Sequence, residues 1–235
     1  MKTKITSLLM TAGFIGLGFS QGFVNLDFES ATFVPIAGDS LGRVQFAQAF
    51  PGWTGTVGGL SPDGVLSNNV YLSTAGFSMI KSNFNTFGVV PGGLIQGKFT
   101  AVLQSGTLTN TLNGVDTSLS QTGLVPVGTQ SLQFKAYQAF DSSGSFSVSL
   151  GGQALSLFVL GGGANFTLYG VDITGFAGQT QLLNFSVPGH TPQSSGEYLY
   201  LDAIQFSTSA VPEPSPLALA GLSAALLACR GWRRK

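Results

Sequence analysis

The chain has 235 residues, of which 43% are hydrophobic, 33 are glycine and only 9% are charged. Ten basic residues balance ten acidic ones, but six basic residues lie at the two ends, so residues 23–209 hold four basic and nine acidic side chains, a net charge of about −5. These four cations stand far apart: Arg43, Lys81, Lys98 and Lys135. Because a nucleic-acid partner needs several cations on one face, we expect no nucleic-acid binding.

Residues 1–20 have the layout of a secretory signal peptide. Two lysines precede an apolar stretch over 5–19, and small residues follow, among them Ser20 and Gly22. A charged end, a short apolar core and a small-residue cleavage site are the three parts of such a signal. We expect cleavage after Ser20, with Gly22 as the alternative. The other interpretation is an uncleaved membrane anchor, although the apolar core is shorter than the ~20 residues that a span requires.

Residues 21–209 show the two-residue alternation of half-buried β-strands. In 131–136, Leu132, Phe134 and Ala136 share one face, while Ser, Gln and Lys side chains share the other. The segment 146–150 alternates in the same way, and no stretch outside the two ends shows a sustained helical stripe. Turn and breaker residues bound further predicted strands at 69–72, 98–103, 154–160, 166–173, 181–187 and 197–206.

Short strands separated by glycine-rich turns predict an all-β fold, either a sandwich or a barrel. The turns supply positive φ cheaply at Asn113-Gly114, Gly151-Gly152 and similar dipeptides. We find no internal repeat and no linker long enough to separate two domains. We therefore expect one domain over 21–209.

Several short motifs of this domain resemble those of the galactose-binding-like jelly rolls, which include many carbohydrate-binding modules and bacterial surface proteins. The domain opens with Asn25-Leu-Asp-Phe-Glu29, continues with Phe50-Pro-Gly-Trp53 and closes with Tyr200-Leu-Asp-Ala-Ile-Gln-Phe206. The resemblance implies an antiparallel β-sandwich of the jelly-roll type. The sequence departs from the common form at Ala203, where a second acidic residue is frequent.

The predicted domain lacks the side chains that acyl-transfer and zinc chemistry need. Its one histidine, His190, lies in a predicted turn, and the only cysteine, Cys229, lies in the tail, so the domain has no disulfide. Paired carboxylates could still hydrolyse glycosides. Most of the nine acidic residues stand beside turn residues, however, where they usually bond their own backbone. We expect no catalytic residue.

Asp202 differs from the other acidic residues because it falls within a predicted apolar strand. It shares a predicted face with Tyr200, Ile204 and Phe206, so both faces of the strand are apolar. Such a carboxylate must be paired, hydrogen-bonded or bound to a metal. In the jelly rolls that the domain resembles, acidic residues of the first and last strands often hold a structural Ca²⁺. Carried over by motif, the ligands are Glu29 and Asp202; a hydrogen-bonded Asp202 without metal is an equal alternative.

A saccharide site needs an aromatic ring beside amide or hydroxyl groups, since a pyranose has an apolar face and a polar rim. Trp53, the only tryptophan before the tail, is the candidate glycan platform. Its alternative role is in the core. Other aromatic and amide side chains offer further parts: Tyr71, Tyr137, Tyr169, Asn68, Asn69 and Gln138.

The C-terminal residues 210–235 have three parts in a fixed order. A proline-bracketed glutamate is followed by an apolar run over 217–229 and then by basic residues. This order resembles the PEP-CTERM sorting signal of Gram-negative bacteria that make extracellular polysaccharide. The motif residues are Val211, Pro212, Glu213 and Pro214, and the stop-transfer residues are Arg230, Arg233, Arg234 and Lys235.

The resemblance implies that 217–229 is a temporary transmembrane helix and that an exosortase removes the tail at the Pro-Glu-Pro label. Basic residues after the run favour a cytoplasmic C-terminus, with the domain facing outward. The run itself is short for a span, so snorkelling or bilayer thinning has to help. An ordinary C-terminal anchor behind a proline-rich stalk is the alternative.

Together these features predict an exported cell-envelope or extracellular-matrix protein that associates with extracellular polysaccharide without catalysis. It would cross the inner membrane, remain anchored there transiently and reach the cell surface or the matrix. Its expected partners are an exosortase and a polysaccharide, with Ca²⁺ as the one expected ion. Two alternatives are a purely structural, self-associating biofilm protein and a polysaccharide-active glycoside hydrolase or lyase.

Overall fold

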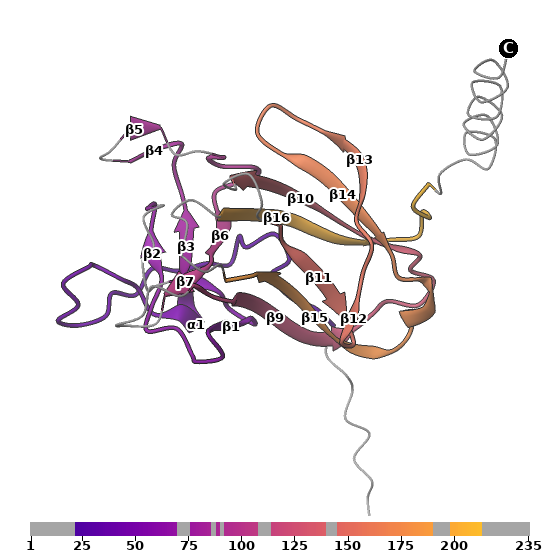
Figure 1. The fold of residues 1–235 in the computed structure, drawn as a ribbon, viewed down its shortest axis with the longest axis horizontal. Coiled ribbons are helices and arrows are strands. Elements are labelled where there is room, and N and C mark those ends of the chain that lie inside the picture. Colours follow the sequence, from indigo (N-terminus) through magenta and orange to yellow (C-terminus); the bar gives the residue numbers. More distant parts are fainter. Residues whose placement is uncertain are drawn as a thin grey trace, which may run out of the picture.

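The computed structural model describes residues 22–69, 76–85, 88–89, 92–107, 114–139, 145–189 and 198–212. The predicted signal peptide, the apolar run 217–229 and His190 therefore lie outside the described residues. Within the described ranges, strands dominate and form two large sheets (Figure 1). In this part of the chain no helix is long and apolar enough to cross a membrane.

The first sheet has five strands, which pair antiparallel throughout. Its order is β1 (Thr54–Val57), β9 (Thr117–Leu124), β15 (Thr180–Val187), β11 (Ser147–Leu150) and β12 (Gln153–Ala154).

The second sheet has seven strands, and only its β2–β3 pair is parallel. Its order is β13 (Phe158–Gly162), β14 (Thr167–Asp172), β10 (Ser131–Ala139), β16 (Tyr198–Ser207), β6 (Thr100–Gln104), β3 (Phe77–Ile80) and β2 (Leu66–Ser67).

The long strands alternate between the two sheets along the chain. β9, β11 and β15 belong to the first sheet, whereas β10, β14 and β16 belong to the second. The central strands read β9-β15-β11-β12 in one sheet and β6-β16-β10-β14 in the other, which is the arrangement of a double-sheet jelly roll. The predicted all-β sandwich of jelly-roll type is thus confirmed, apart from the one short parallel pair.

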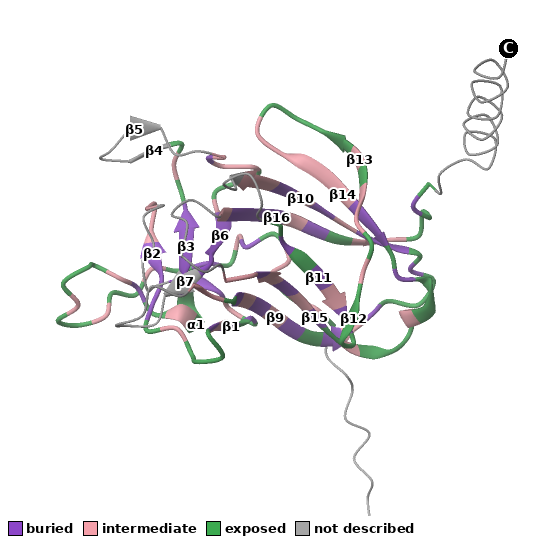
Figure 2. Cartoon of the chain, viewed as in Figure 1, coloured by how far each residue is buried: buried purple, intermediate pink, exposed green. Residues whose placement is uncertain are grey.

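The core lies between the two sheets. Figure 2 shows that buried residues concentrate in the strands of both sheets, while the β13 edge is exposed. Phe134 of β10 meets Phe185 of β15 edge-to-face, with ring centroids 5.2 Å apart, and its other side stacks on Tyr169 at 5.5 Å. Truncating a buried phenylalanine to alanine costs about 3–5 kcal/mol. This aromatic cluster therefore fixes the sheets against each other.

The remaining elements are short. They are α1 (Phe46–Ala49), the 3₁₀ helix η2 (Thr174–Phe176), and the small hairpins β4 (Phe84–Asn85) with β5 (Gly88–Val89) and β7 (Gly106–Thr107) with β8 (Gly114–Val115). The predicted strand 154–160 is instead two strands, β12 and β13. Residues 155–157 between them are not in a strand.

Candidate functional site

Residues 92–99, which we call the anchored loop, are held by the two acidic residues that the sequence singled out. The Glu29 carboxylate accepts hydrogen bonds from the backbone N–H groups of Lys98 (2.7 Å) and Phe99 (3.2 Å) through Oε1. Asp202 Oδ2 accepts from the backbone N–H of Gln96 at 3.0 Å. The structure thus brings Glu29 and Asp202 to the same short loop, from the first and last parts of the domain.

Further side chains secure the loop at its other positions. The Leu94 N–H donates to Asn83 Oδ1 at 2.7 Å, and the Ile95 N–H donates to Thr100 Oγ1 at 2.9 Å. Asn165, in the turn between β13 and β14, donates through Nδ2 to the Gly92 and Leu94 carbonyls, both at 2.9 Å. Fixed side-chain acceptors and donors therefore define the backbone path of a loop that lacks regular structure.

Asp202 is a buried carboxylate with three hydrogen-bond donors. Asp202 is only 1% exposed. Besides the bond from Gln96, its carboxylate accepts hydrogen bonds from the Thr100 hydroxyl at 2.8 Å and from the Ala203 N–H at 2.7 Å. Burial raises the pKa of Asp202 to about 6; hydrogen bonds from Thr100, Ala203 and Gln96 oppose this rise, and the nearby Glu29 charge adds to it.

A β-bulge next to Asp202 changes which side chains share its face. The pairing of β10 with β16 shifts register between Gln133 and Lys135, and Ala203 has φ of 49°, in the left-handed region. The extra residue turns Ile204 into the core, whereas Asp202 lies on the outer face. The prediction that Asp202 and Ile204 share a face is therefore wrong, because simple alternation does not survive a bulge.

The bulge and the anchored loop border a cavity of about 400 Å³, which we call the bulge pocket. Strands β14, β10 and β16 contribute to its lining, together with Asp27 and the anchored loop. Its lining residues are Asp27, Gln96, Lys135, Leu168, Ala203, Ile204 and Gln205. A pocket of this volume is within the range of small-ligand sites.

Lys135 is the cation of this pocket. Its ammonium donates to Gln96 Oε1 at 2.7 Å and lies 4.7 Å from the centroid of the Phe166 ring. On the opposite strand, Gln205 Nε2 donates to Gln133 Oε1 at 3.1 Å, which leaves the Gln205 carbonyl oxygen as an acceptor. The pocket thus joins polar donors and acceptors to the apolar residues Leu168, Ala203 and Ile204, the combination that hydroxyl-rich ligands require.

No residue of this pocket is a site residue predicted from the sequence. Lys135 and Gln133 belong to the polar face of the predicted strand 131–136, and such a face most often only contacts solvent. The signal that could have found them is that the polar faces of two strands, 131–136 and 197–206, meet when the strands pair. That pairing is a property of the topology and not of either segment alone.

Trp53 lies in the core and not at a surface. The residue is 6% exposed, its ring packs at centroid distances of 5.6 Å from Phe28 and 6.5 Å from Phe185, and its Nε1 donates to the Asn25 carbonyl at 3.0 Å. A ring enclosed in this way offers no face to a pyranose. The burial of Trp53 contradicts its predicted role as a glycan platform and agrees with the alternative.

The other predicted parts of a saccharide site are dispersed. Tyr169 stacks on Phe134 in the core, and Gln138 Nε2 donates to its hydroxyl at 3.0 Å. Asn68 accepts from the Lys81 and Ser82 N–H groups in a turn. Tyr137 packs edge-to-face on Tyr200, over the outer side of the second sheet, and Tyr71 lies outside the described residues.

The donor set around Glu29 and Asp202 does not fit Ca²⁺. Calcium takes six to eight oxygen ligands, whereas the contacts of these two carboxylates are with N–H and O–H donors. Among the described residues, no three His, Cys, Asp or Glu side chains gather closely enough to hold a metal. The contacts support the metal-free alternative for Asp202, and a calcium ion there stays a prediction.

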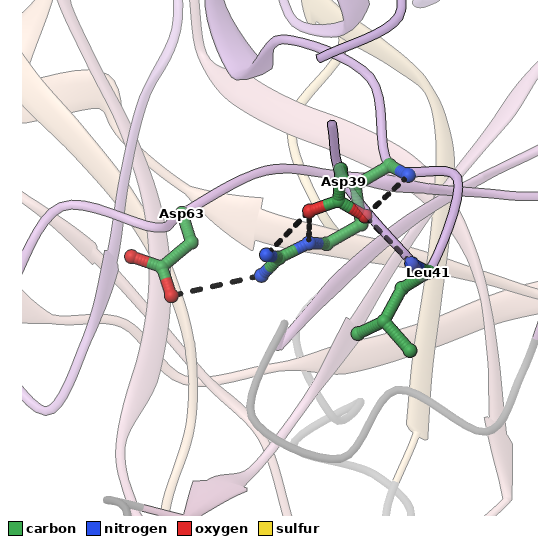
Figure 3. A network of polar contacts seen from close by, with 4 residues as sticks. Asp39, Leu41 and Asp63 are labelled. Atoms are coloured by element: carbon green, nitrogen blue, oxygen red, sulfur yellow. Dashed lines mark hydrogen bonds and ion pairs between the residues drawn. The ribbon is translucent and has the colours of Figure 1, made fainter. Parts of the chain in front are cut away.

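A second cluster of charges joins the loop before α1, which holds Asp39 and Arg43, to Asp63 between β1 and β2 (Figure 3). Asp39 Oδ2 accepts from Arg43 Nε at 2.7 Å and pairs with Nη2 at 2.6 Å, while Asp63 Oδ2 lies 3.6 Å from Nη1. The hydrogen bond from Arg43 lowers the pKa of Asp39. Asp39 Oδ1 also accepts from the Leu41 N–H at 2.9 Å. Its bonds close a turn, as expected for an aspartate beside glycine.

At the C-terminal end, the described chain continues past β16 into the first residues of the predicted sorting signal. Val211 is 8% exposed, and Pro212 lines a second cavity of 390 Å³ with Phe158, Val159 and Leu160. Glu213, Pro214 and the basic residues Arg230, Arg233, Arg234 and Lys235 lie outside the described residues.

Comparison of the sequence with known families matches residues 210–235 to the PEP-CTERM protein-sorting motif. The chain carries a PEP-CTERM sorting signal. A protein with this signal is exported, anchored transiently in the membrane and processed by an exosortase, so the predicted sorting is confirmed at this level.

Two further comparisons cover the rest of the chain. A solved structure of TmCBM61 in complex with β-1,4-galactotriose is similar, with 14% sequence identity and a TM-score of 0.38, over 80% of this PEP-CTERM chain and 97% of that chain. No curated protein matches the sequence.

Proposed function

We propose that this exported protein is a non-catalytic surface or matrix component that binds extracellular polysaccharide in the bulge pocket. The observation that carries the proposal is the pocket itself, whose lining combines one cation, one carboxylate and two amides with apolar residues: Lys135, Asp27, Gln96 and Gln205 with Leu168, Ala203 and Ile204. Saccharide hydroxyls both donate and accept hydrogen bonds, so they match a pocket with both kinds of group. Sorting outward would bring the pocket to the polymer.

The anchored loop gives the proposed pocket a preformed wall. Gln96 is fixed through its backbone by Asp202 and through its side chain by Lys135. A wall that is ordered before binding costs little conformational entropy when the ligand arrives. In this proposal Glu29 and Asp202 act at a distance, as positioning residues that shape the site without touching the ligand.

Affinity electrophoresis of the exosortase-processed protein tests the proposal, in gels that contain different polysaccharides, including the host's own exopolysaccharide. We expect one or more polymers to retard the wild-type protein and the Lys135→Ala variant to lose that retardation. Lys81→Ala is the matched control, because Lys81 also stands over a phenylalanine ring, 4.9 Å from the Phe33 centroid, but outside the pocket. Equal migration of wild type in every gel would reject the proposal.

A second candidate function, self-association, is favoured by the edge of the second sheet. β13 pairs only with β14, Val159 is 69% exposed, and the sequence from 142 to 171 has no charged residue. Edge strands of soluble proteins are usually protected by charges, prolines or bulges. Here the β13 pairing has one bulge but no charge. Concentration-dependent assembly without saccharide, suppressed by Val159→Lys, would favour this candidate.

The proposal of a non-catalytic role has its own test. A glycoside hydrolase needs two carboxyl groups that reach the scissile bond, but Glu29 and Asp202 are engaged by the anchored loop, and Asp39 is paired with Arg43. Steady release of reducing sugar from any polysaccharide by the purified protein, or of unsaturated product by a lyase, would contradict the proposal.

A further inference from the structure

The sorting signal begins within the folded domain. Its matched region starts at residue 210, only a few residues after β16 ends at Ser207. Val211, the first residue of the Val-Pro-Glu-Pro motif, is buried, although the motif serves as an external label. The label and the sandwich therefore share residues.

A small slot on β14 receives Val211. Gly170 has no side chain, and a Cβ atom built there would lie 3.2 Å from Val211 Cγ2 and 2.7 Å from Leu160 Cδ1. The Val211 methyl group thus packs directly over the Gly170 backbone, beside Leu160 of β13. Ala210 and Pro212, on either side of Val211, line the adjoining cavity with Phe158 and Val159.

Hydrogen bonds tie the chain down just before the slot. The Ser207 carbonyl accepts from the Gln130 N–H at 2.8 Å, and the Ser209 carbonyl accepts from the Ser131 hydroxyl at 2.7 Å. In Figure 1 this yellow segment turns away from β16 near the start of β13 and the end of β14. Backbone bonds up to Ser209 and side-chain packing at Val211 together hold the segment 207–212, which we call the docked segment.

We infer that Val211 docking on Gly170 gates exosortase processing, so that residues 210–212 must leave the sandwich before the chain is cut. A protease acts on backbone that is accessible and unbonded on both sides of the scissile bond. In the docked segment Ala210 and Pro212 are exposed, but Val211 between them is buried, so the bonds on either side of Val211 are not free while it is docked. When opening and closing are faster than cleavage, the rate of cleavage follows the population of the open form. The inference rests on exosortase sorting and is independent of saccharide binding.

The test compares processing rates of full-length variants by pulse-chase in exosortase-positive cells, with exosortase-negative cells as the background. Gly170→Val fills the slot and expels Val211 without changing residues 210–235. Gly161→Val is the matched control, because a Cβ at Gly161, on the same hairpin, meets nothing within 4 Å. We expect severalfold faster processing of Gly170→Val and no change for Gly161→Val.

A second variant keeps the test valid if Gly170→Val does not fold. A Gly-Ser-Gly-Ser insertion after Ser209 leaves both the sandwich and the 210–235 signal intact but separates Val211 from its slot. It should be processed as fast as Gly170→Val. Unchanged or slower processing of the insertion variant would overturn the inference. It would mean that undocking of Val211 does not limit the rate at which the exosortase cuts the chain.

Digestion of the precursors from exosortase-negative cells by proteinase K separates docking from sorting. Both released variants should lose the tail faster than wild type, and Gly161→Val should not. If they do so but exosortase processing is unaffected, the gate is rejected while sorting stands. If wild type is not processed even in exosortase-positive cells, the failure lies in sorting itself and not in the gate.

Discussion

Glu29 and Asp202, from opposite ends of the domain, accept hydrogen bonds from backbone N–H groups only two positions apart, at Lys98 and Gln96. Each carboxylate accepts a hydrogen bond that the carbonyl group of a partner strand would accept in a sheet, because buried or half-buried N–H groups need acceptors. The loop that forms one wall of the bulge pocket is therefore built by residues remote in sequence. Its path depends on the hydrogen bonds that these two side chains accept.

Replacing Asp202 by Asn should remove a pH dependence of stability. The pKa of Asp202 is about 6 in the folded protein against an ordinary value of 3.8, so the folded state binds this proton more tightly than the unfolded state. Ionised Asp202 costs stability above about pH 6, and the cost is relieved as pH falls toward 3.8. Relative to Asp202→Asn, the wild-type free energy of unfolding should rise by on the order of 1 kcal/mol between about pH 7.5 and pH 5, as measured by urea unfolding.

Asp172 provides a control of opposite sign. Hydrogen bonds from the Thr174 N–H and hydroxyl lower the pKa of this exposed carboxyl, so its contribution to stability is lost as pH falls. Comparison of wild type with Asp172→Asn should therefore give the reverse slope. If the free energy of unfolding changed with pH in the same way for wild type and for Asp202→Asn, the raised pKa of the buried Asp202 carboxyl would be contradicted.

Gly97→Ala should destabilise the domain more than glycine substitution in an open turn. Gly97 has φ of +64°, and a Cβ there would clash with the Glu29 carboxylate that bonds the loop. Gly128, with φ of +81° and nothing within 4 Å of its Cβ, pays the backbone cost alone. We expect Gly128→Ala to cost about 1 kcal/mol and Gly97→Ala to cost clearly more. Thermal unfolding measures both; equal melting temperatures would mean that Glu29 does not hold the loop.

Trp53→Phe should lower stability and leave saccharide binding intact. The substitution keeps an aromatic ring between Phe28 and Phe185 but removes the indole N–H that bonds the Asn25 carbonyl. Loss of one buried hydrogen bond costs about 1–3 kcal/mol. Urea unfolding gives the stability, and affinity electrophoresis of the folded variant gives the binding. A folded variant that no longer binds would restore Trp53 as a ligand-contacting residue.

EDTA should not change the melting temperature. The carboxylates of Glu29 and Asp202 have N–H and O–H donors as partners, so removal of divalent cations takes nothing from them. Differential scanning calorimetry in EDTA and in added Ca²⁺ checks this expectation. A fall in EDTA that Ca²⁺ reverses, and that Asp202→Asn abolishes, would instead establish the calcium site implied by the motif resemblance.

The long strands could be predicted from sequence because their inward positions are apolar. Leu132, Phe134 and Ala136 of β10 are all buried, as their alternation indicates. β9 was missed, although its alternation in the structure is regular. Of its inward side chains Thr117, Leu119 and Gln121, only Leu119 is apolar. A strand whose core face is built from small and polar residues shows no hydrophobic alternation in its sequence. β9 is a strand because it pairs with β1 on one side and β15 on the other.

The site was less predictable than the fold. Short sequence motifs single out Glu29 and Asp202. Both side chains bond the loop from Leu94 to Phe99, and nothing in the sequence of this loop predicts that its N–H groups need carboxylate acceptors. The bulge at Ala203 could not be predicted from the sequence either, because alanine has no preference for the positive φ found there. Register shifts are set by pairing across the sheet, and this information is not local to the strand.

The central position of β16 ties the timing of folding to the timing of export. This strand is the last of the described part of the chain, yet it lies between β10 and β6, and its Leu201 pairs with Ala101. A chain that emerges N-terminus first cannot close its second sheet until β16 has crossed the membrane. By then the sorting signal follows within a few residues. In a chain exported in this way, the second sheet is completed only when the tail reaches the membrane, so folding and sorting would fall at the same stage of export.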